Sequence, residues 1–191
     1  MSQTTTSTRQ VDGRTVPAPG TWVVDTAHSS VEFVARHLVV TKVRGRFADW
    51  SAELVVGDRP EDSRVDVTIR SASIDTGDEG RNGHLVSPDF LDVERFPTLT
   101  FTTTSVTPGG GDRWDVLGDL TIHGVTRPVT LAVEFAGAAT DPWGTTKAAF
   151  SASTEIDRED FGLTWNQALE TGGVLVGKQV RIEIEVQAAQ G

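Results

Sequence analysis

The sequence predicts an all-β protein made of about eight antiparallel strands. Residues between Trp22 and Val186 repeatedly alternate apolar and polar side chains, which is typical of half-buried strands. The alternating runs are short and are separated by turns rich in Gly, Pro and Asp. Most of the helix signals lie in one central connection, residues 74–101. Such strands form either a sandwich or a closed barrel, and a barrel of this size is filled by side chains or holds one small ligand.

The strand runs can be followed in chain order. The second run places Val31, Phe33 and Ala35 on one face, with Glu32 and Val34 on the other. The later runs show the same two-residue period, and in each of them one face is apolar. The predicted runs are residues 22–25, 30–38, 42–56, 64–74, 99–106, 114–123, 129–135, 145–156 and 174–186.

The central connection predicts a helical cap over the mouth of the β structure. Ser87 followed by Pro88 and Asp89 has the pattern of an N-cap, a proline at the first helical position and an acid in the first turn. We therefore expect a short helix to begin after Ser87. Pro97 ends the helical pattern, and strand chemistry returns after it.

A second, weaker helix signal precedes Ser87. Asp78 or Thr76 can cap a turn over residues 81–86. Gly80 and Gly83 each cost about 1 kcal/mol relative to alanine in a helix interior, so this turn should be loose.

Composition excludes several classes of function. The chain has 27 acidic and 17 basic residues, a net charge of −10, which argues against nucleic-acid partners because phosphate binding needs clustered Lys and Arg. It contains no cysteine, so disulfides, thiolate nucleophiles and thiolate metal sites are excluded. Residues 1–20 contain no apolar run, which predicts a disordered or draped tail, no signal peptide, no integral membrane segment and a cytoplasmic protein. Residues 21–188 are expected to form one domain.

The alternation also predicts which side chains point inward. Whether they enclose a ligand cavity or fill the barrel completely is left open by the pattern, since cavities are exceptions in close-packed proteins. The cap contributes Leu85, Phe90 and Phe96 to the same apolar region. The predicted inward residues of the strands are Phe33, Phe47, Val67, Ile69, Phe101, Leu120, Ile122, Phe135 and Phe150.

Several ordered motifs resemble a known family. They are Asp25 with His28-Ser29-Ser30, VARH at 34–37, VRGRF at 43–47, SIDT at 73–76, GDLTIHGVT at 118–126 and IDREDFGL at 156–163. His84-Leu85, Asp89-Phe90 and Phe96-Pro97 belong to the same set. On these residues the chain resembles the YceI-like, polyisoprenoid-binding proteins over nearly all of residues 22–186.

The resemblance implies a function as well as a fold. It implies an eight-stranded antiparallel lipocalin-like β-barrel, with one or two short helical connections capping its mouth. The barrel would bind, store or transport a long-chain isoprenoid (a polyprenyl lipid, an isoprenoid quinone or a precursor) or another fatty lipid, without catalysis, metal or cofactor and as a homodimer. Many relatives are exported, unlike the expectation for this chain. Residues 161–173 resemble the family's second helical connection, in which Phe161 and Trp165 line the pocket or plug one end of the barrel.

A lipid with a polar head needs polar groups near the mouth. The candidates are His84, Arg81 and Asn82 in the cap, with His37 and Arg158 at strand ends. Arg158 can alternatively pair with Asp157 or Asp160.

Two other functions remain open. His28, His37, His84 and His123 invite a metal-dependent or histidine-based hydrolase, but they form neither a His-x-His nor an HExxH arrangement. A ligand-free, packed interaction domain predicts instead that replacing Phe47 or Phe101 by alanine costs ~3 to 5 kcal/mol of stability, as in a filled core.

Overall fold

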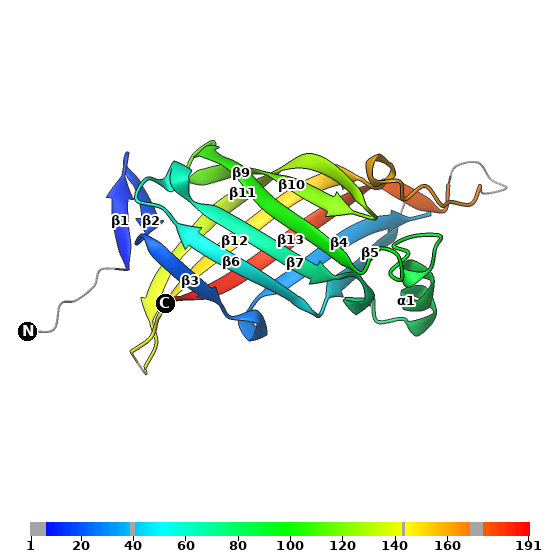
Figure 1. Ribbon diagram of the computed structural model, residues 1–191, viewed down its shortest axis with the longest axis horizontal. Coiled ribbons are helices and arrows are strands. Elements are labelled where there is room, and N and C mark those ends of the chain that lie inside the picture. Colours follow the sequence, from blue (N-terminus) through cyan, green and yellow to red (C-terminus); the bar gives the residue numbers. More distant parts are fainter. Residues whose placement is uncertain (1–6, 39–40, 143, 169–173) are drawn as a thin grey trace, which may run out of the picture.

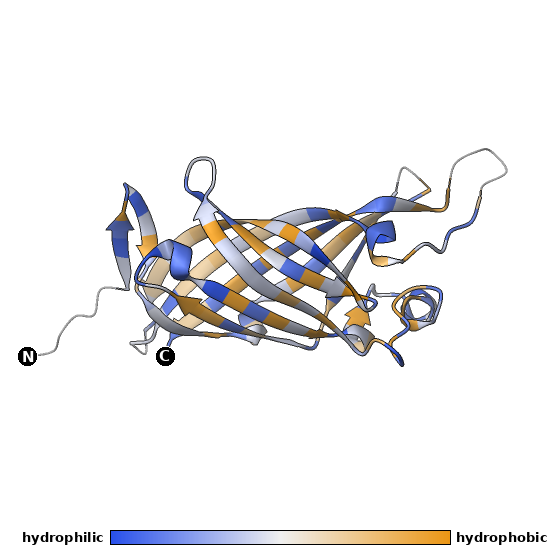
Figure 2. Ribbon diagram, turned by 45° about the horizontal axis from the view of Figure 1, so that its top comes forward, coloured by the Kyte–Doolittle hydropathy of each residue, from blue (hydrophilic) through white to orange (hydrophobic). Residues whose placement is uncertain are grey.

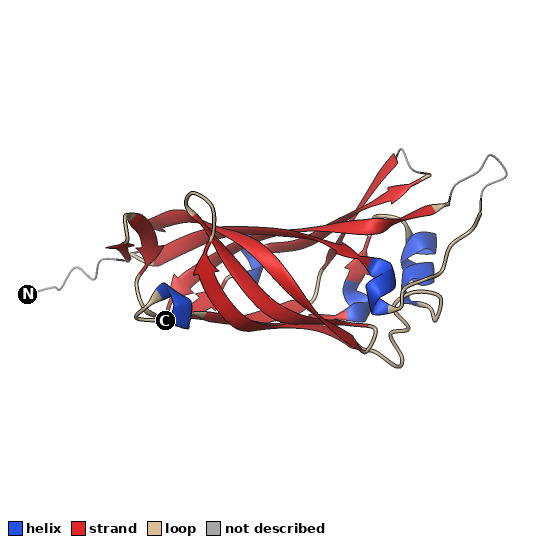
Figure 3. Cartoon of the chain, turned by 90° about the horizontal axis from the view of Figure 1, so that it is seen from above, coloured by secondary structure: helices blue, strands red, loops and turns tan. Residues whose placement is uncertain are grey.

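The chain forms an elongated β-barrel whose two ends carry different elements (Figure 1). The computed structural model describes residues 7–38, 41–142, 144–168 and 174–191. Both described ends of the chain lie at one end of the barrel, beside a small N-terminal hairpin. The α-helix α1 lies at the other end, which is also clear when the barrel is seen from above (Figure 3). We call these the hairpin end and the α1 end.

Thirteen strands and one α-helix are present in the described residues. The helix α1 spans Glu79–Val86. Short 3-10 turns occupy Thr26–His28, Pro60–Asp62, Ser71–Ser73 and Arg158–Phe161. The strands are β1 (Thr8–Val11), β2 (Arg14–Pro17), β3 (Gly20–Val24), β4 (Ser30–His37), β5 (Thr41–Phe47), β6 (Trp50–Val56), β7 (Arg64–Arg70), β8 (Ile74–Asp75), β9 (Thr98–Pro108), β10 (Arg113–Ile122), β11 (Val125–Thr140), β12 (Thr146–Asp157) and β13 (Val176–Gln190).

Three pairs of strands lie end to end, so the barrel wall has eight segments. β3 and β4 both run antiparallel to β13, β3 along its last residues and β4 along the part from Val176 to Glu185. β6 pairs with β3 and β5 with β4, which makes β5 and β6 the next segment. β7 pairs with β6 and β8 with β5, which makes the third. β9, β10, β11, β12 and β13 follow, each antiparallel to its neighbour, and β13 closes the ring. The predicted eight-stranded antiparallel barrel is confirmed.

Alternation along the strands places the apolar side chains inside. Apolar and polar residues follow one another along most strands, as the banded ribbon in Figure 2 shows. On β10, for example, Trp114, Val116, Leu120 and Ile122 are all buried, whereas Leu117 and Asp119 are exposed. A barrel has no free sheet edge, so the whole inner face can be apolar without inviting edge-to-edge association.

The central helix begins nine residues before the start that the Ser87-Pro88-Asp89 pattern predicts, and the weaker signal at Asp78 is the one that is confirmed. Asp78 is the N-cap of α1, since its carboxylate accepts a hydrogen bond of 2.7 Å from the backbone N–H of Arg81. Ser87 instead ends this helix, and its hydroxyl donates to the carbonyl of His84 at 2.7 Å. The predicted helix after Ser87 is therefore wrong. Residues 88–91 and 93–95 form turns, and the N–H groups of Leu91 and Val93 donate back to carbonyls of α1.

The other predicted helical connection is also wrong where the structure describes it. After the 3-10 turn Arg158–Phe161, residues 163–167 have no helical structure, and Ala168 forms an isolated bridge with Val174. The rest of the predicted connection, residues 169–173, lies outside the described residues. Arg158 binds the carbonyls of Leu163 and Trp165, which holds this segment extended.

The predicted N-terminal tail contains regular structure. β1 and β2 pair as an antiparallel hairpin, and Val16 on β2 is only 2% exposed. Asp12 and Gly13 form its turn with positive φ angles of 49° and 80°, as a two-residue hairpin turn requires. Part of the region expected to be a disordered or draped tail is thus packed on the barrel.

Candidate functional site

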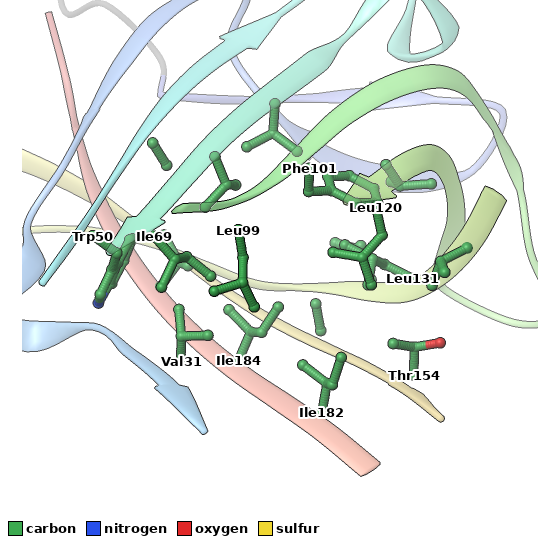
Figure 4. A pocket seen from close by; sticks show the side chains of 18 of the residues that line it. Val31, Trp50, Ile69, Leu99, Phe101, Leu120, Leu131, Thr154, Ile182 and Ile184 are labelled. Atoms are coloured by element: carbon green, nitrogen blue, oxygen red, sulfur yellow. The ribbon is translucent and has the colours of Figure 1, made fainter. Parts of the chain in front are cut away.

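The inside of the barrel contains an apolar cavity of about 350 Å³. This volume lies within the range of small-molecule sites, roughly 300 to 1,000 Å³. Figure 4 shows Val31, Ile69, Leu99, Phe101 and their neighbours arranged around it. Among the described residues that line it, six carry charged or hydroxyl side chains: Glu32, Ser63, Arg64, Thr103, Thr154 and Arg158. The barrel is therefore not filled completely by its own side chains.

Twelve of the seventeen residues predicted for the binding site line this cavity. They come from the wall strands, from α1 and the turn after it, and from the 3-10 turn after β12. Phe101, Leu120 and Ile122 are at most 8% exposed, and Phe90 is 7% exposed. The twelve are Phe33, Phe47, Val67, Ile69, Leu85, Phe90, Phe101, Leu120, Ile122, Phe135, Phe150 and Arg158.

The other five predicted residues lie elsewhere at the α1 end. His37 ends β4 and pairs with Val176. Phe96 packs edge-on against His123, with ring centroids 4.5 Å apart. Phe161 is 1% exposed and belongs to the buried core rather than to the lining of the cavity. Trp165 and His84 contact each other edge-on at 4.5 Å.

His84, Phe90 and Trp165 form an aromatic cluster that joins α1 to the segment after β12. The ring of Phe90 lies 5.0 Å from that of His84 and 5.3 Å from that of Trp165. The Nε2 atom of His84 lies 2.9 Å from a carboxylate oxygen of Asp89. These contacts connect the helical cap to the far side of the α1 end.

Arg158 is the buried charge of this region, and its partners are backbone carbonyls. The side chain is 3% exposed. Its guanidinium donates to the carbonyls of Gly177, Leu163, Trp165 and Val176. No carboxylate of a described residue lies within ion-pair distance, so the predicted pairing with Asp157 or Asp160 is not formed. Burial lowers the pKa of Arg158, and the carboxylates of Glu159 and Asp157 partly offset that shift.

The histidines do not converge. Among the described residues, no group of three or more His, Asp and Glu side chains is placed to hold a metal ion. His28 lies beside Asp25, which accepts from its Nδ1 at 2.9 Å if that nitrogen is protonated, and from Lys147 at 3.1 Å. The Nε2 atom of His84 lies within hydrogen-bond distance of the Asp89 carboxylate, and the ring of His123 packs on that of Phe96.

The rings of Phe33 and Phe101 pack directly against glycines of the barrel wall. A Cβ atom at Gly45 would lie 2.3 Å from the Cζ atom of Phe33, and a Cβ at Gly118 would lie 2.3 Å from that of Phe101. Gly45 is the cross-strand partner of Phe33. Each glycine therefore gives a ring room to lie along the wall instead of projecting across the cavity.

We expect Gly45→Ala to destabilise the barrel by about 1 to 3 kcal/mol, the usual cost of overpacking. The new methyl group forces the ring of Phe33 off the wall. Urea unfolding of the variant measures this loss, which should shrink in a Phe33→Leu background because the clash is removed. Gly80→Ala is the matched control, since its Cβ would approach nothing closer than 3.5 Å. If Gly45→Ala lowers the unfolding free energy of the Phe33→Leu variant as much as that of the unaltered protein, the clash with the ring of Phe33 is not the cause.

Several cavity residues were missed by the sequence reasoning. Trp50 and Trp114 line the cavity, as do Val180, Ile182 and Ile184 of β13. The apolar–polar alternation of residues 180–186 contains the signal that identifies the three β13 residues as inward-facing. Val16 and Pro17 also line it, although they precede the expected domain.

The helices give no indication of a membrane span. Within the described residues, no helix is both long enough and apolar enough to cross a bilayer.

Sequence and structure comparisons agree on the family. The model of the YceI-like domain matches residues 22–188. A UPF0312 protein of Staphylococcus aureus strain N315 is 42% identical over 166 residues, 85% of this chain and 94% of the relative. A UPF0312 protein of Vibrio vulnificus strain YJ016 is 40% identical over 145 residues, 74% of this chain and 77% of the relative.

Solved structures show the same fold. The crystal structure of Burkholderia cenocepacia BcnA matches with a TM-score of 0.75 and 27% identity, covering 86% of this chain and 98% of that one. A polyisoprenoid binding domain from Saccharophagus degradans matches with a TM-score of 0.62 and 15% identity, covering 91% of this chain and all of that one. Because the family model matches residues 22–188, well over half of its length, the chain belongs to the YceI-like family.

Proposed function

We propose that this protein is a non-enzymatic carrier that holds the tail of a long-chain isoprenoid, or a similar amphiphilic lipid, in its barrel. The observation that carries the proposal is the apolar cavity, in which aliphatic and aromatic side chains from every wall segment face one another. The polyisoprenoid binding domain of Saccharophagus degradans, which has the same fold, supports this choice of ligand class.

Burial of the tail provides the binding energy. Each buried methylene contributes about 0.8 kcal/mol, so one five-carbon isoprene unit supplies roughly 4 kcal/mol before costs. The entropy lost when a flexible tail is ordered opposes this gain. The affinity therefore depends on how much of the tail fits inside the cavity. An alkyl or prenyl tail makes no hydrogen bonds, which suits a wall with so few polar side chains.

The α1 end is the proposed opening. No residue of α1 is fully buried, although Leu85 lines the cavity. Elements with little buried apolar surface open at the lowest free-energy cost. The polar head then lies near exposed Arg81 and the partly exposed His84. Arg158 already uses most of its donors on carbonyls, so it holds the rim rather than the head.

The direct test is mass spectrometry of organic extracts from the purified protein. We expect a prenyl or other long-chain lipid in near-stoichiometric amount. Added prenyl alcohols should quench tryptophan fluorescence, because Trp50 and Trp114 line the cavity. Repeatedly lipid-free extracts without any quenching would overturn the proposal. A lipid that is recovered hydrolysed after incubation would favour the hydrolase instead.

We expect Gly83→Ala to slow lipid release. A Cβ atom at Gly83 meets nothing within 4 Å, and alanine stabilises a helix interior by about 1 kcal/mol relative to glycine. If α1 must loosen before the lipid leaves, release slows about fivefold. Stopped-flow transfer of a fluorescent prenyl lipid to acceptor vesicles measures the rate. Asp78→Ala removes the N-cap and should accelerate release by a similar factor. Equal rates in all three proteins would show that α1 is not the opening.

A further inference from the structure

The N-terminal hairpin covers the end of the barrel opposite α1. β1 and β2 lie across that end, beside the C-terminus (Figure 1). The hairpin ends at Pro17, whereas the YceI-like domain begins at residue 22. The hairpin is therefore an addition to the part of the chain that matches the family model.

One face of the hairpin is the end wall of the cavity. Val16 and Pro17 both line the cavity, together with Val56, Val106 and Trp114 at the same end. Val16 is 2% exposed and belongs to the main core cluster. Thr15, its neighbour on β2, is exposed and lies on the opposite face.

Two arginines fix the hairpin to the turns of the barrel. The guanidinium of Arg9 donates to the carbonyls of Asp58 and Gly57, the second at 2.6 Å, in the turn between β6 and β7. Arg14 donates to the carbonyl of Gly109 at 3.0 Å, in the turn between β9 and β10. Its guanidinium also lies 5.1 Å from the centre of the Trp114 ring, within the range of a cation–π contact.

The base of the hairpin is held to the chain on both sides. The backbone N–H of Ala18 donates to the carbonyl of Ser7 at 2.8 Å. The indole N–H of Trp22, a residue that is 1% exposed, donates to the carbonyl of Ala18 at 3.0 Å. β1 and β2 are thereby connected to the first wall strand.

The hairpin and the helix α1 therefore differ in how firmly they are packed on the barrel. The hairpin buries Val16 almost completely and binds carbonyls in two separate turns. The helix α1 buries no residue completely. Because a segment with more buried apolar contacts opens less often, we take the hairpin as the fixed element and the helix α1, which is only one part of its end, as the movable one.

We propose that the N-terminal hairpin is a stopper that limits how long a lipid tail the barrel accepts. The inference rests on the proposed function and specifies it further. A tail that enters at the α1 end stops at Val16 and Pro17, so these residues select length. A tail that is too long leaves carbons in water and gains nothing from them.

Variants of Val16 in the full-length chain test the stopper. Val16→Phe adds a ring at the end wall and shortens the cavity, whereas Val16→Ala lengthens it. Thr15→Phe is the matched control, because it adds the same ring on the exposed face of the same strand. Binding is measured by tryptophan quenching with a series of prenyl alcohols that differ by one isoprene unit.

For the unaltered protein we expect affinity to rise with tail length and then to level off or fall. Val16→Phe should move this limit toward shorter tails and weaken the longest accepted alcohol at least tenfold. Val16→Ala should move the limit the other way, and Thr15→Phe should leave it unchanged. If Val16→Ala does not fold, the comparison of Val16→Phe with Thr15→Phe decides alone.

Failure of the stopper and failure of the proposed function give different results. Unaltered protein that binds prenyl alcohols, with the same length limit in Val16→Phe, overturns the stopper only. Absence of quenching by every alcohol in every variant overturns the proposed function itself.

Discussion

Replacing Ala152 by tryptophan is expected to weaken lipid binding at least a hundredfold while the barrel still folds. Ala152 lies in the middle of β12, between Val133 on β11 and Ile184 on β13, and all three residues line the cavity. An indole at this position occupies space that the proposed tail needs. Excluding a single isoprene unit removes roughly 4 kcal/mol of burial, about a thousandfold in affinity before compensation.

The control for this prediction is the next residue on the same strand. Ser153 does not line the cavity, so Ser153→Trp places the same side chain on the outer face. Binding of a fluorescent prenyl lipid and urea unfolding are measured for both variants. Unchanged binding by Ala152→Trp would show that the lipid does not occupy the barrel. Loss of folding by that variant alone would indicate a core with no spare space.

The barrel wall could be predicted because its signal is local. Each strand has one face toward the interior, so the two-residue period of the sequence assigns Phe33, Val67 and Ile69 to the cavity without any knowledge of their partners. The two-residue period also predicts a wall segment correctly where two strands lie end to end. Residues 42–56 were predicted as one run, and β5 and β6 do form one wall segment.

Two capping signals compete within ten residues of the helical cap, and the weaker one, at Asp78, is the one that the structure confirms. Ser87-Pro88-Asp89 has the better local pattern, whereas Asp78 is followed by Gly80 and Gly83, which disfavour a helix. The helix capped by Asp78 places Leu85 against the cavity, and this packing favours it over a helix that starts after Ser87. Tertiary packing thus overrides propensity, and no single-residue preference contains that information.

The hairpin was missed for a related reason. Asp12-Gly13 is a strong signal for a two-residue turn, but its flanks contain mostly polar residues such as Gln10 and Thr15. An isolated two-stranded hairpin is at best marginally stable in water. This one is held by Val16, Arg9 and Arg14 against turns that lie far away in the sequence, and only the closed barrel brings those turns to it.

Replacing Arg158 by alanine is expected to destabilise the protein by about 3 to 5 kcal/mol. The guanidinium satisfies four backbone carbonyls at a position that is 3% exposed. Each buried acceptor left without a donor costs roughly 1 to 3 kcal/mol, and solvent that enters the new space recovers part of this. The same bonds hold the segment after the 3-10 turn against the first residues of β13. Removing the Arg158 side chain should therefore loosen the α1 end.

Two further variants separate this structural role from recognition of a lipid head. Arg158→Lys keeps the positive charge but cannot reach four carbonyls from one ammonium group, so most of the stability is still lost. Arg127→Ala removes an exposed arginine whose hydrogen bond within the described part of the chain goes to the carbonyl of Thr126, and it should change stability by less than about 0.5 kcal/mol. Urea unfolding measures all three variants. If Arg158→Ala unfolds at the same urea concentration as the unaltered protein but no longer binds lipid, Arg158 contacts the head group and the carbonyls are satisfied without it.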